Sequence, residues 1–176
     1  MYIVRTKKGI LFLADTTINK NPSAEEIVEI SILIAKSVKQ FRIKPRLALL
    51  SYSNFGSTRT EDSSKMAEAS EIIRKSYPDL VVDGEIQADF ALDSEKTERI
   101  FPFSPFAQES ANVLIFPNLE SGNIAYKLMQ EVADVDSIGP ILVGMKKSVH
   151  ILQLGCTVRE IINMVTLSVV DAQIKR

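Results

Sequence analysis

Short runs of consecutive apolar residues alternate along this chain with longer segments in which apolar residues recur every three or four positions. Short runs of this kind are typical of strands buried on both faces of a sheet, and the longer pattern is typical of helices. The predicted strands are residues 10–14, 47–52, 80–82 and 112–116, followed by 139–144 and 149–152. The predicted helices are residues 23–41, 63–75, 85–92, 119–132 and 157–174. Strands that alternate with helices favour parallel pairing, so we predict an α/β protein with a largely parallel sheet.

Capping signals and prolines support this division of the chain. Ser23 with Glu26, and Thr157 with Glu160, have the spacing of capping boxes, in which two residues satisfy each other's backbone N–H at a helix start. Residues 93–110 contain two prolines and are expected to be irregular.

Composition excludes several classes of protein and site. A chain of 176 residues with 45% apolar residues can bury a core as one domain without a disulfide or a metal. The formal net charge of −1 gives no electrostatic reason to bind nucleic acid or an anionic membrane. One cysteine and one histidine exclude a disulfide framework, a multi-cysteine site and a histidine cluster, though not a carboxylate metal site. We expect no metal in this chain. Apolar runs fall short of the ~20 residues that span a bilayer, and no signal peptide is visible, so we expect a cytoplasmic protein.

Ligands of open parallel sheets bind at the carboxyl ends of the strands. This rule points to the loops 51–60, 83–89, 117–123 and 153–157. The first of them carries small and polar residues between a strand and a helix: Ser51, Ser53, Asn54, Gly56 and Ser57. Its backbone N–H groups could face an anion, helped by the helix N-terminus, or the loop could be a polar turn that only caps the helix.

The next two loops also leave two interpretations open. Asp83, Glu85 and Asp89 could hold Mg²⁺ or act as acid and base, or they could be turn and cap residues. Residues 118–123, with Lys127 in the following helix, could present donors to a phosphate or a carbonyl, or they could simply start that helix.

The single histidine and the single cysteine are weaker candidates. His150 lies among apolar neighbours, which is typical of a core residue. Cys156, just before the last helix, could be a nucleophile or a buried structural residue, and no histidine or acid adjoins it. The glycines form no Gly-x-Gly pair and the serines no Gly-x-Ser-x-Gly, which excludes a dinucleotide fingerprint, a Walker loop and a nucleophile elbow.

Five blocks in order carry a family resemblance. They are Asn-Pro-Ser-Ala-Glu-Glu (21–26), Ser-Tyr-Ser-x-x-Gly-Ser (51–57), Asp-Gly-Glu-Ile-Gln-Ala-Asp (83–89), the segment 111–128, and Ile-Gly-Pro-Ile-Leu-Val-Gly (138–144). Together they resemble the C-terminal half of the phosphotransacetylase (phosphate acetyltransferase) family, over nearly the whole chain. Residues 53–57, 149–152, 158–164 and 169–173 are most similar to the phosphotransacetylase-like domain at the C-terminus of bacterial NADP-dependent malic enzymes. The resemblance implies a three-layer α-β-α fold of the phosphotransacetylase and isocitrate dehydrogenase type.

One departure from the family pattern bears on catalysis. Active phosphotransacetylases usually have Asn-Asp-Leu-Ser-Arg-Gly where this chain has residues 150–155. The family's catalytic Ser and Arg then fall on Gln153 and Leu154, and its acidic base falls on Glu160, one methylene longer than the usual Asp. Losing one donor that stabilises developing negative charge costs ~100- to 1000-fold in rate. The resemblance therefore implies a degenerate site with no catalytic residue in this chain.

The resemblance also implies a role in regulation. It suggests acetyl-CoA as an effector, and a homodimer or higher oligomer, in a parent malic enzyme that uses NADP and Mg or Mn to convert malate to pyruvate. No cofactor is expected in this chain itself. The contacts implied by the matched blocks are Ser51, Ser53, Asn54, Gly56, Ser57, Gln87, Asp89, Asn118, Asn123 and Lys127. The alternatives are an active phosphate acetyltransferase domain and a purely structural assembly module.

The expected organisation is a fragment of a longer protein. Residues 1–145 would form the C-terminal lobe, and residues 146–176 a terminal strand and helix that in the family return to the other lobe. The malic-enzyme part and the N-terminal phosphotransacetylase-like lobe are then the missing partners. An apolar face of the last helix needs cover, either by folding back on the lobe or in a dimer: Ile161, Val165, Leu167 and Val169.

Overall fold

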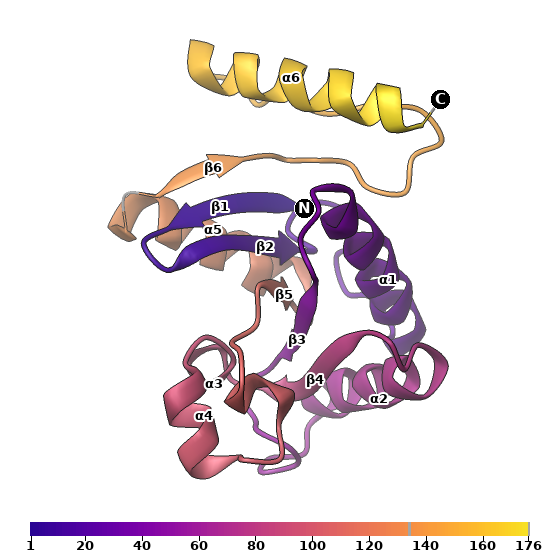
Figure 1. The fold of residues 1–176 in the computed structure, drawn as a ribbon, viewed down its shortest axis with the longest axis vertical. Coiled ribbons are helices and arrows are strands. Elements are labelled where there is room, and N and C mark those ends of the chain that lie inside the picture. Colours follow the sequence, from indigo (N-terminus) through magenta and orange to yellow (C-terminus); the bar gives the residue numbers. More distant parts are fainter. Residues whose placement is uncertain (134, 176) are drawn as a thin grey trace.

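The structure, a computed structural model, describes residues 1–133 and 135–175 (Figure 1). Within these residues one sheet has six strands: β1 (Tyr2–Thr6), β2 (Gly9–Ala14), β3 (Arg46–Leu50), β4 (Val81–Ile86), β5 (Val113–Ile115) and β6 (Asp136–Ile138). Their order across the sheet is β4-β3-β5-β2-β1-β6. The neighbours β4, β3, β5 and β2 are parallel, whereas β1 runs antiparallel to β2 and to β6. The predicted α/β class with a largely parallel sheet is confirmed.

Helices cover both faces of this sheet. They are α1 (Ala24–Gln40), α2 (Glu61–Ser76), α3 (Ala88–Ala91), α4 (Ser94–Ile100), α5 (Leu119–Ala133) and α6 (Val158–Ile174), with a 3₁₀ turn η1 (Pro105–Ala107). Figure 1 shows α1 and α2 on one face and α5 with α3 and α4 on the other, which gives three layers. The helix α6 lies apart from these layers, beyond the edge strand β6.

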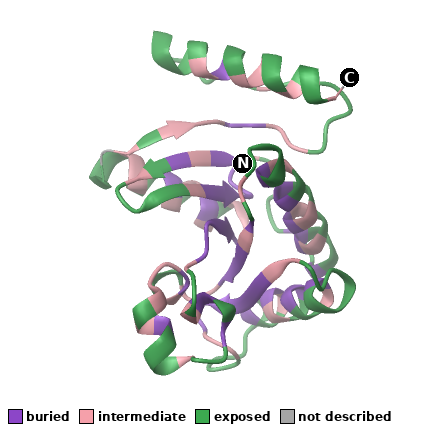
Figure 2. Cartoon of the chain, in the orientation of Figure 1, coloured by how far each residue is buried: buried purple, intermediate pink, exposed green. Residues whose placement is uncertain are grey.

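Alternating side chains of the central strands build a core on each face. Phe12, Leu47 and Val113 pack towards α1 and α2, whereas Leu13 and Leu114 pack towards α5. All five are at most 3% exposed, and Figure 2 shows the buried residues concentrated in the sheet and the inner helix faces. Strands that bury both faces read as continuous apolar runs, which is why the sequence located them.

Several expectations about local structure are wrong, among them the start of the predicted helix 85–92, since β4 runs to Ile86 and α3 begins at Ala88. Residues 139–144 and 149–152 are not strands: β6 ends at Ile138, and the segment up to residue 157 has no regular structure. The terminal segment 146–176 therefore holds a helix but, within its described residues, no strand. Residues 93–110 are not wholly irregular, because the Asp93 side chain accepts from the N–H of Lys96 and caps α4. The strand β1 was not predicted, because its inward-facing residues Tyr2 and Val4 form too short an alternation to stand out.

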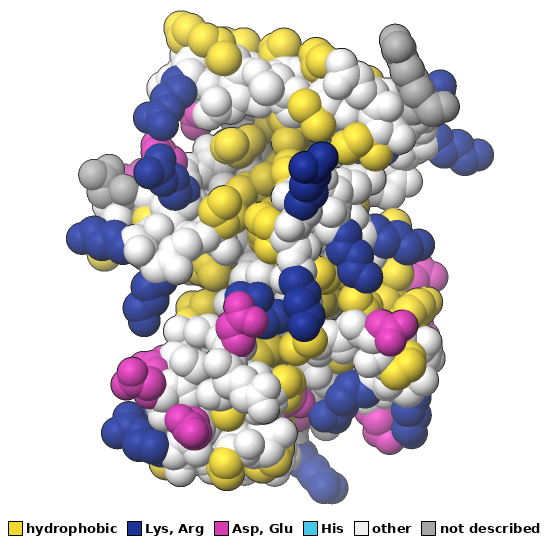
Figure 3. All heavy atoms as spheres, viewed as in Figure 1, with side chains coloured by type: hydrophobic (Ala, Val, Ile, Leu, Met, Phe, Trp, Pro, Cys, Tyr) yellow, Lys and Arg dark blue, Asp and Glu magenta, His cyan; other side chains and the backbone are white. Residues whose placement is uncertain are grey.

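Only part of the apolar surface of α6 folds back on the lobe. Met164 is 4% exposed and Leu167 packs against the core. Ile161, Val165 and Val169 remain exposed at 38%, 54% and 52%. Figure 3 shows hydrophobic side chains gathered along the outer side of this helix. None of the helices in the described part of the chain has the length and apolarity needed to cross a bilayer.

Candidate functional site

The parallel strands place their carboxyl ends, and the loops that follow, along one edge of the sheet. The loops after β3, β4 and β5 were predicted from the sequence. The loop after β2 was not, although β2 pairs with β5 and its last residue Ala14 accepts from the N–H of Phe116 at 2.7 Å. The candidate site therefore includes a fourth loop at this edge.

The loop after β3 is organised around one buried carboxylate, that of Glu85 on β4. Glu85 is 2% exposed, and its Oε1 accepts from Ser53 Oγ at 2.9 Å and from the Gly56 N–H at 2.5 Å. The Ser53 hydroxyl also accepts from the Thr58 N–H and lies 3.1 Å from Ser57 Oγ. These contacts fix the loop on the tip of β4 by hydrogen bonds to a charged acceptor, which are stronger than neutral ones.

Asn54 and Gln87 join the same loop to the end of β4. The Gln87 N–H donates to Asn54 Oδ1 at 2.8 Å, and Gln87 Nε2 donates to the Tyr52 carbonyl at 2.6 Å. The backbone N–H of Ser51 donates to the Ile86 carbonyl at 3.0 Å. The structure thus brings together the predicted residues of the first two loops, except for Asp89.

The three carboxylates of residues 83–89 point to separate partners. Asp83 lies 3.1 Å from Arg74, Glu85 holds the loop, and Asp89 pairs with Lys96. Burial raises the pKa of Asp83 despite Arg74 and a Ser104 hydrogen bond, whereas the Lys96 ammonium lowers the pKa of Asp89. Among residues 1–133 and 135–175, no three His, Cys, Asp or Glu side chains are grouped as a metal site. This cluster is therefore not arranged as a shared acid–base or metal centre.

The loop after β5 makes the start of α5. Asn118 Oδ1 accepts from the Ser121 N–H at 2.9 Å, as a helix cap does. Asn123 Nδ2 donates to the Thr16 carbonyl at 3.4 Å, which ties α5 to the loop after β2. Lys127 is exposed, with its Nζ 5.4 Å from the ring centre of Tyr126.

The loop after β2 contains a carboxylate that accepts from three backbone N–H groups. Asp15 is 8% exposed and takes the N–H groups of Thr17, Ile18 and Asn19 at 2.7–3.3 Å. Burial raises the pKa of this carboxyl, but these hydrogen bonds outweigh it and lower the pKa overall. An Asp-Thr-Thr sequence at the end of a predicted strand was the signal that could have identified this loop.

Two stacked tyrosines connect α5 with the C-terminal segment. Tyr2 and Tyr126 stack with ring centroids 4.2 Å apart, and Gln153 Nε2 lies 3.0 Å from the Tyr2 hydroxyl. Burial raises the pKa of Tyr2. Burial would also raise the pKa of Tyr126, but hydrogen bonds with Tyr2 and Gln153 and the charge of Lys127 lower it. Sequence reasoning missed this pair, because Tyr2 and Tyr126 lie far apart in the chain.

Three positions to which the sequence resemblance assigned degenerate catalytic residues line one small cavity of about 110 Å³. Gln153, Leu154 and Glu160 all line it, together with Cys156 and Asn163. The carboxylate of Glu160 accepts from the Thr157 N–H at 2.6 Å, which completes the predicted capping box of α6. In its observed position Glu160 therefore caps the start of α6.

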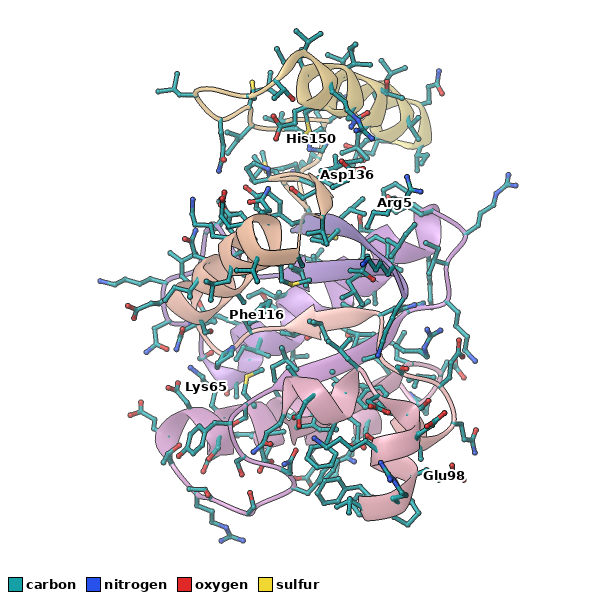
Figure 4. All side chains as sticks on the ribbon, turned by 90° about the vertical axis from the view of Figure 1, so that its left-hand side faces the viewer. Arg5, Lys65, Glu98, Phe116, Asp136 and His150 are labelled. Atoms are coloured by element: carbon teal, nitrogen blue, oxygen red, sulfur yellow. The ribbon has the colours of Figure 1, made fainter. Side chains whose placement is uncertain are left out.

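His150 lies outside that cavity, between α6 and the sheet (Figure 4). Its side chain is 2% exposed, with Nε2 3.5 Å from Asp171 Oδ2 and 3.3 Å from Ser148 Oγ. Burial lowers the pKa of His150 in spite of the Asp171 charge. The expectation of a core histidine agrees with this burial.

Comparisons with known proteins agree with the fold and the matched blocks. Residues 1–169 match the model of the phosphate acetyl/butaryl transferase family. The chain is 43% identical over 165 residues to an NADP-dependent malic enzyme of Haemophilus influenzae, which covers 94% of this chain and 22% of that protein. It is 42% identical over 168 residues to a phosphate acetyltransferase of Clostridium acetobutylicum, covering 95% of this chain and 50% of that protein.

A solved structure leads to the same family. The EutD phosphotransacetylase from Staphylococcus aureus superposes with a TM-score of 0.88 at 30% identity, covering 99% of this chain and 53% of that chain. The chain thus spans about half of that structure and of the clostridial enzyme, and 22% of the malic enzyme. This chain belongs to the phosphate acetyl/butaryl transferase family.

Proposed function

We propose that this chain is the acetyl-CoA-sensing and oligomerising lobe of an NADP-dependent malic enzyme, and that it does not itself transfer acetyl groups. Sequence identity does not decide this, since a malic enzyme and a phosphate acetyltransferase match at 43% and 42%. The observation that carries the proposal is the charge of the cavity at Gln153 and Leu154. Among the described residues that line it, Glu160 is the sole charged side chain, and it is negative.

Transfer of an acetyl group between CoA and phosphate brings negative charge to the reacting centre. A cation there stabilises the transition state by several kcal/mol, on the order of 3–4 kcal/mol per donor. Leu154 stands where the family has its arginine, and its side chain is fully exposed. The nearby Arg159 is directed to Asp136 on β6, 3.1 Å away (Figure 4 labels Asp136). Residues 1–133 and 135–175 therefore supply no cation to the lining of this cavity, which supports a binding role over a catalytic one.

Acetyl-CoA would bind along the carboxyl edge of the sheet. The loop 51–57 with Gln87 lies at one end of this edge, and Asn118, Asn123 and Lys127 lie at the other, next to the stacked tyrosines. NADP and Mg or Mn would be held by the malic-enzyme part of the parent, since the carboxylates 83, 85 and 89 already have separate partners. Regulation then requires that the effector bind two states of the whole protein with different affinity, typically by ~1–3 kcal/mol.

Exposed apolar surface supports partners for this lobe. Ile124, Leu128 and Val132 recur every four residues on α5 and are 52%, 57% and 81% exposed. A second apolar surface runs along α6. Contiguous exposed apolar surface of this kind marks interaction sites. We assign the apolar surface of α6, with the rest of segment 146–176, to contact with the missing lobe. We assign the exposed apolar residues of α5 to the interface of a homodimer.

Calorimetric titration of acetyl-CoA, with CoA as the control ligand, tests the proposal on this chain and on the longer protein that holds both lobes. Saturable binding without acetyl phosphate production in a coupled assay is the expected result. Lys127→Met should weaken binding, whereas Lys44→Met, an exposed lysine at the opposite edge before β3, should not. Absence of binding to the longer protein would remove the sensor role and leave assembly.

An active acetyltransferase is the second candidate, favoured by the 42% identity to the clostridial enzyme and by the acid retained at Glu160. Acetyl phosphate formation by the longer protein, abolished by Glu160→Gln, would establish it.

A further inference from the structure

The loop that joins β3 to α2 looks at first like an anion-binding loop, with glycine and hydroxyl residues before a helix. The backbone N–H groups of residues 53–58 are, however, already engaged within the protein. The Phe55 N–H donates to the Glu85 carbonyl at 2.9 Å, and the Gly56 N–H donates to Glu85 Oε1. Hydrogen bonds inside the loop occupy the others: Ser53 N–H to Ser51 Oγ, Asn54 N–H to Ser57 Oγ, Ser57 N–H to the Asn54 carbonyl and Thr58 N–H to Ser53 Oγ.

Glu85 stands where an incoming anion would have to bind. Its carboxylate is 2% exposed and takes both a hydroxyl and a backbone N–H on the same oxygen. A phosphate oxygen in that position would have to displace the carboxylate, and one beside it would be repelled by like charge. The loop is therefore unsuited to the charged end of a CoA ester.

Two polar groups at the surface of the loop remain available. Asn54 Oδ1 accepts from the Gln87 N–H, and Gln87 Nε2 donates to the Tyr52 carbonyl. Within the part of the chain that the structure describes, Asn54 Nδ2 and Gln87 Oε1 have no hydrogen-bond partner. These are one donor and one acceptor on adjacent side chains, both half-buried. A secondary amide presents the complementary pair, one C=O and one N–H.

We propose that Glu85 is a positioning residue that fills the anion position of this loop, so that Asn54 and Gln87 bind an amide of the uncharged pantetheine arm. This inference rests on the proposed binding of an acyl-CoA at the sheet edge. The phosphates of the ligand bind elsewhere along that edge, away from the Glu85 carboxylate.

NMR of the ¹⁵N-labelled full chain tests the ligand class directly. Titration with pantetheine, which lacks phosphate, should shift the Asn54 side-chain NH₂ signals and the Gln87 signals. Titration with inorganic phosphate should leave the Gly56 amide unmoved. A saturable phosphate-induced shift of Gly56 in the unmodified chain would overturn the proposal.

A conservative substitution separates the proposed contact from loop structure. Asn54→Asp keeps the Oδ1 that accepts from Gln87 but removes the free donor, so pantetheine affinity should fall about tenfold while the loop signals persist. Gln40→Glu, the same amide-to-acid change at the exposed last residue of α1, is the matched control and should leave pantetheine affinity unchanged. Equal affinity of Asn54→Asp and the unmodified chain would count against the amide contact.

Chemical rescue tests the role of Glu85 independently of any acyl-CoA. Glu85→Ala removes the carboxylate and frees two buried donors. Added formate should bind this variant saturably and return the Gly56 amide signal towards its original position, and it should not bind the unmodified chain. Failure of formate to restore a folded Glu85→Ala loop would contradict the positioning role. If that variant does not fold, the phosphate titration and Asn54→Asp still decide the proposal.

These experiments also distinguish failure of the amide contact from failure of the proposed acetyl-CoA binding. Acetyl-CoA binding that leaves Asn54 and Gln87 unperturbed would overturn the amide contact while the sensor role stands. Formate rescue without acetyl-CoA binding to the longer protein would support the positioning role and remove the sensor.

Discussion

Two regions of the molecule differ in how far their side chains find partners within this chain. One is the tip formed by the loop after β3 and the end of β4, and the other is the terminal helix α6. At the tip, Ser53 and Glu85 are buried and the polar groups of the loop bond to one another. On α6, Val158 and Ile162 are 73% and 59% exposed, and Met164 is the residue of this helix that is buried. The buried polar contacts of the tip are made within this chain, whereas α6 presents apolar surface that a second body can cover. Substitutions in the first region should act within this chain, and those on the outer face of α6 should act only in an assembly.

Gly84→Ala should produce the largest loss at the tip. Gly84 has φ +146°, and a Cβ there would lie 2.6 Å from the Leu49 carbonyl oxygen. Strained backbone and overpacking together should lower the free energy of unfolding by about 2–4 kcal/mol, measured by urea denaturation. Gly9→Ala is the control, because φ is +129° but a Cβ meets nothing within 4 Å. Similar losses in both variants would show that close approach to Leu49 does not matter.

Met164→Ala should produce the next largest effect, and it should be confined to α6. Removing this buried side chain should cost about 2–3 kcal/mol of local stability, seen as faster hydrogen exchange of α6 amides. Ile162→Ala, on the exposed face, should change the stability of the isolated chain by less than about 0.5 kcal/mol. Comparable exchange in the two variants would mean that Met164 does not anchor the helix.

Acidification should loosen the α6 region through His150. Burial holds the pKa of His150 below its usual value, with Asp171 of α6 and Lys175 just after that helix facing it. Between that lowered pKa and about 6.5, the unfolded chain binds the proton and the folded chain does not, so stability falls as pH falls through this window. Melting temperatures at pH 7.0 and 5.5 should therefore differ more for the unmodified chain than for His150→Gln. An identical pH response would exclude His150 as the titrating group.

Substitution at Glu160 should give the smallest effect. Its carboxylate caps α6 through the Thr157 N–H, so Glu160→Ala should lower stability by about 0.5–1 kcal/mol. Glu160→Gln keeps an acceptor oxygen and should retain most of that stability, as judged from denaturant midpoints. A loss as large as that of Met164→Ala would assign Glu160 more than a capping role.

The sequence was informative where one local pattern decides the structure. Phe12, Leu47 and Val113 lie in continuous apolar runs, and the capping boxes at Ser23 and Thr157 form as predicted. It was misleading at 139–144, an apolar run that lies beyond β6 and has no regular structure. An apolar run indicates that its residues are buried. Whether it forms a strand depends on hydrogen bonding to a neighbouring strand, which can be remote in sequence.

The candidate site was predictable as a set of loops but not as a set of contacts. The strand-end rule located the Asn54 loop and Gln87. It did not indicate that Glu85, one of three nearby acids, would turn inward and take the Gly56 N–H. It also gave no indication of the Tyr2–Tyr126 stack, because a contact between residues so distant in the chain follows from topology alone.

The position of β1 inside the sheet has a consequence for synthesis. β1 can pair with β2 as soon as the short hairpin between them has been synthesised. Its other edge can pair only after β6 has been synthesised, since Ile3 lies opposite Ile138. At ~5–20 residues per second, a ribosome needs on the order of 10 s to reach that partner. For that interval β1 is an open edge able to pair with a strand of another nascent chain. Mispairing between neighbouring nascent chains on a polysome therefore becomes possible at this edge during that interval.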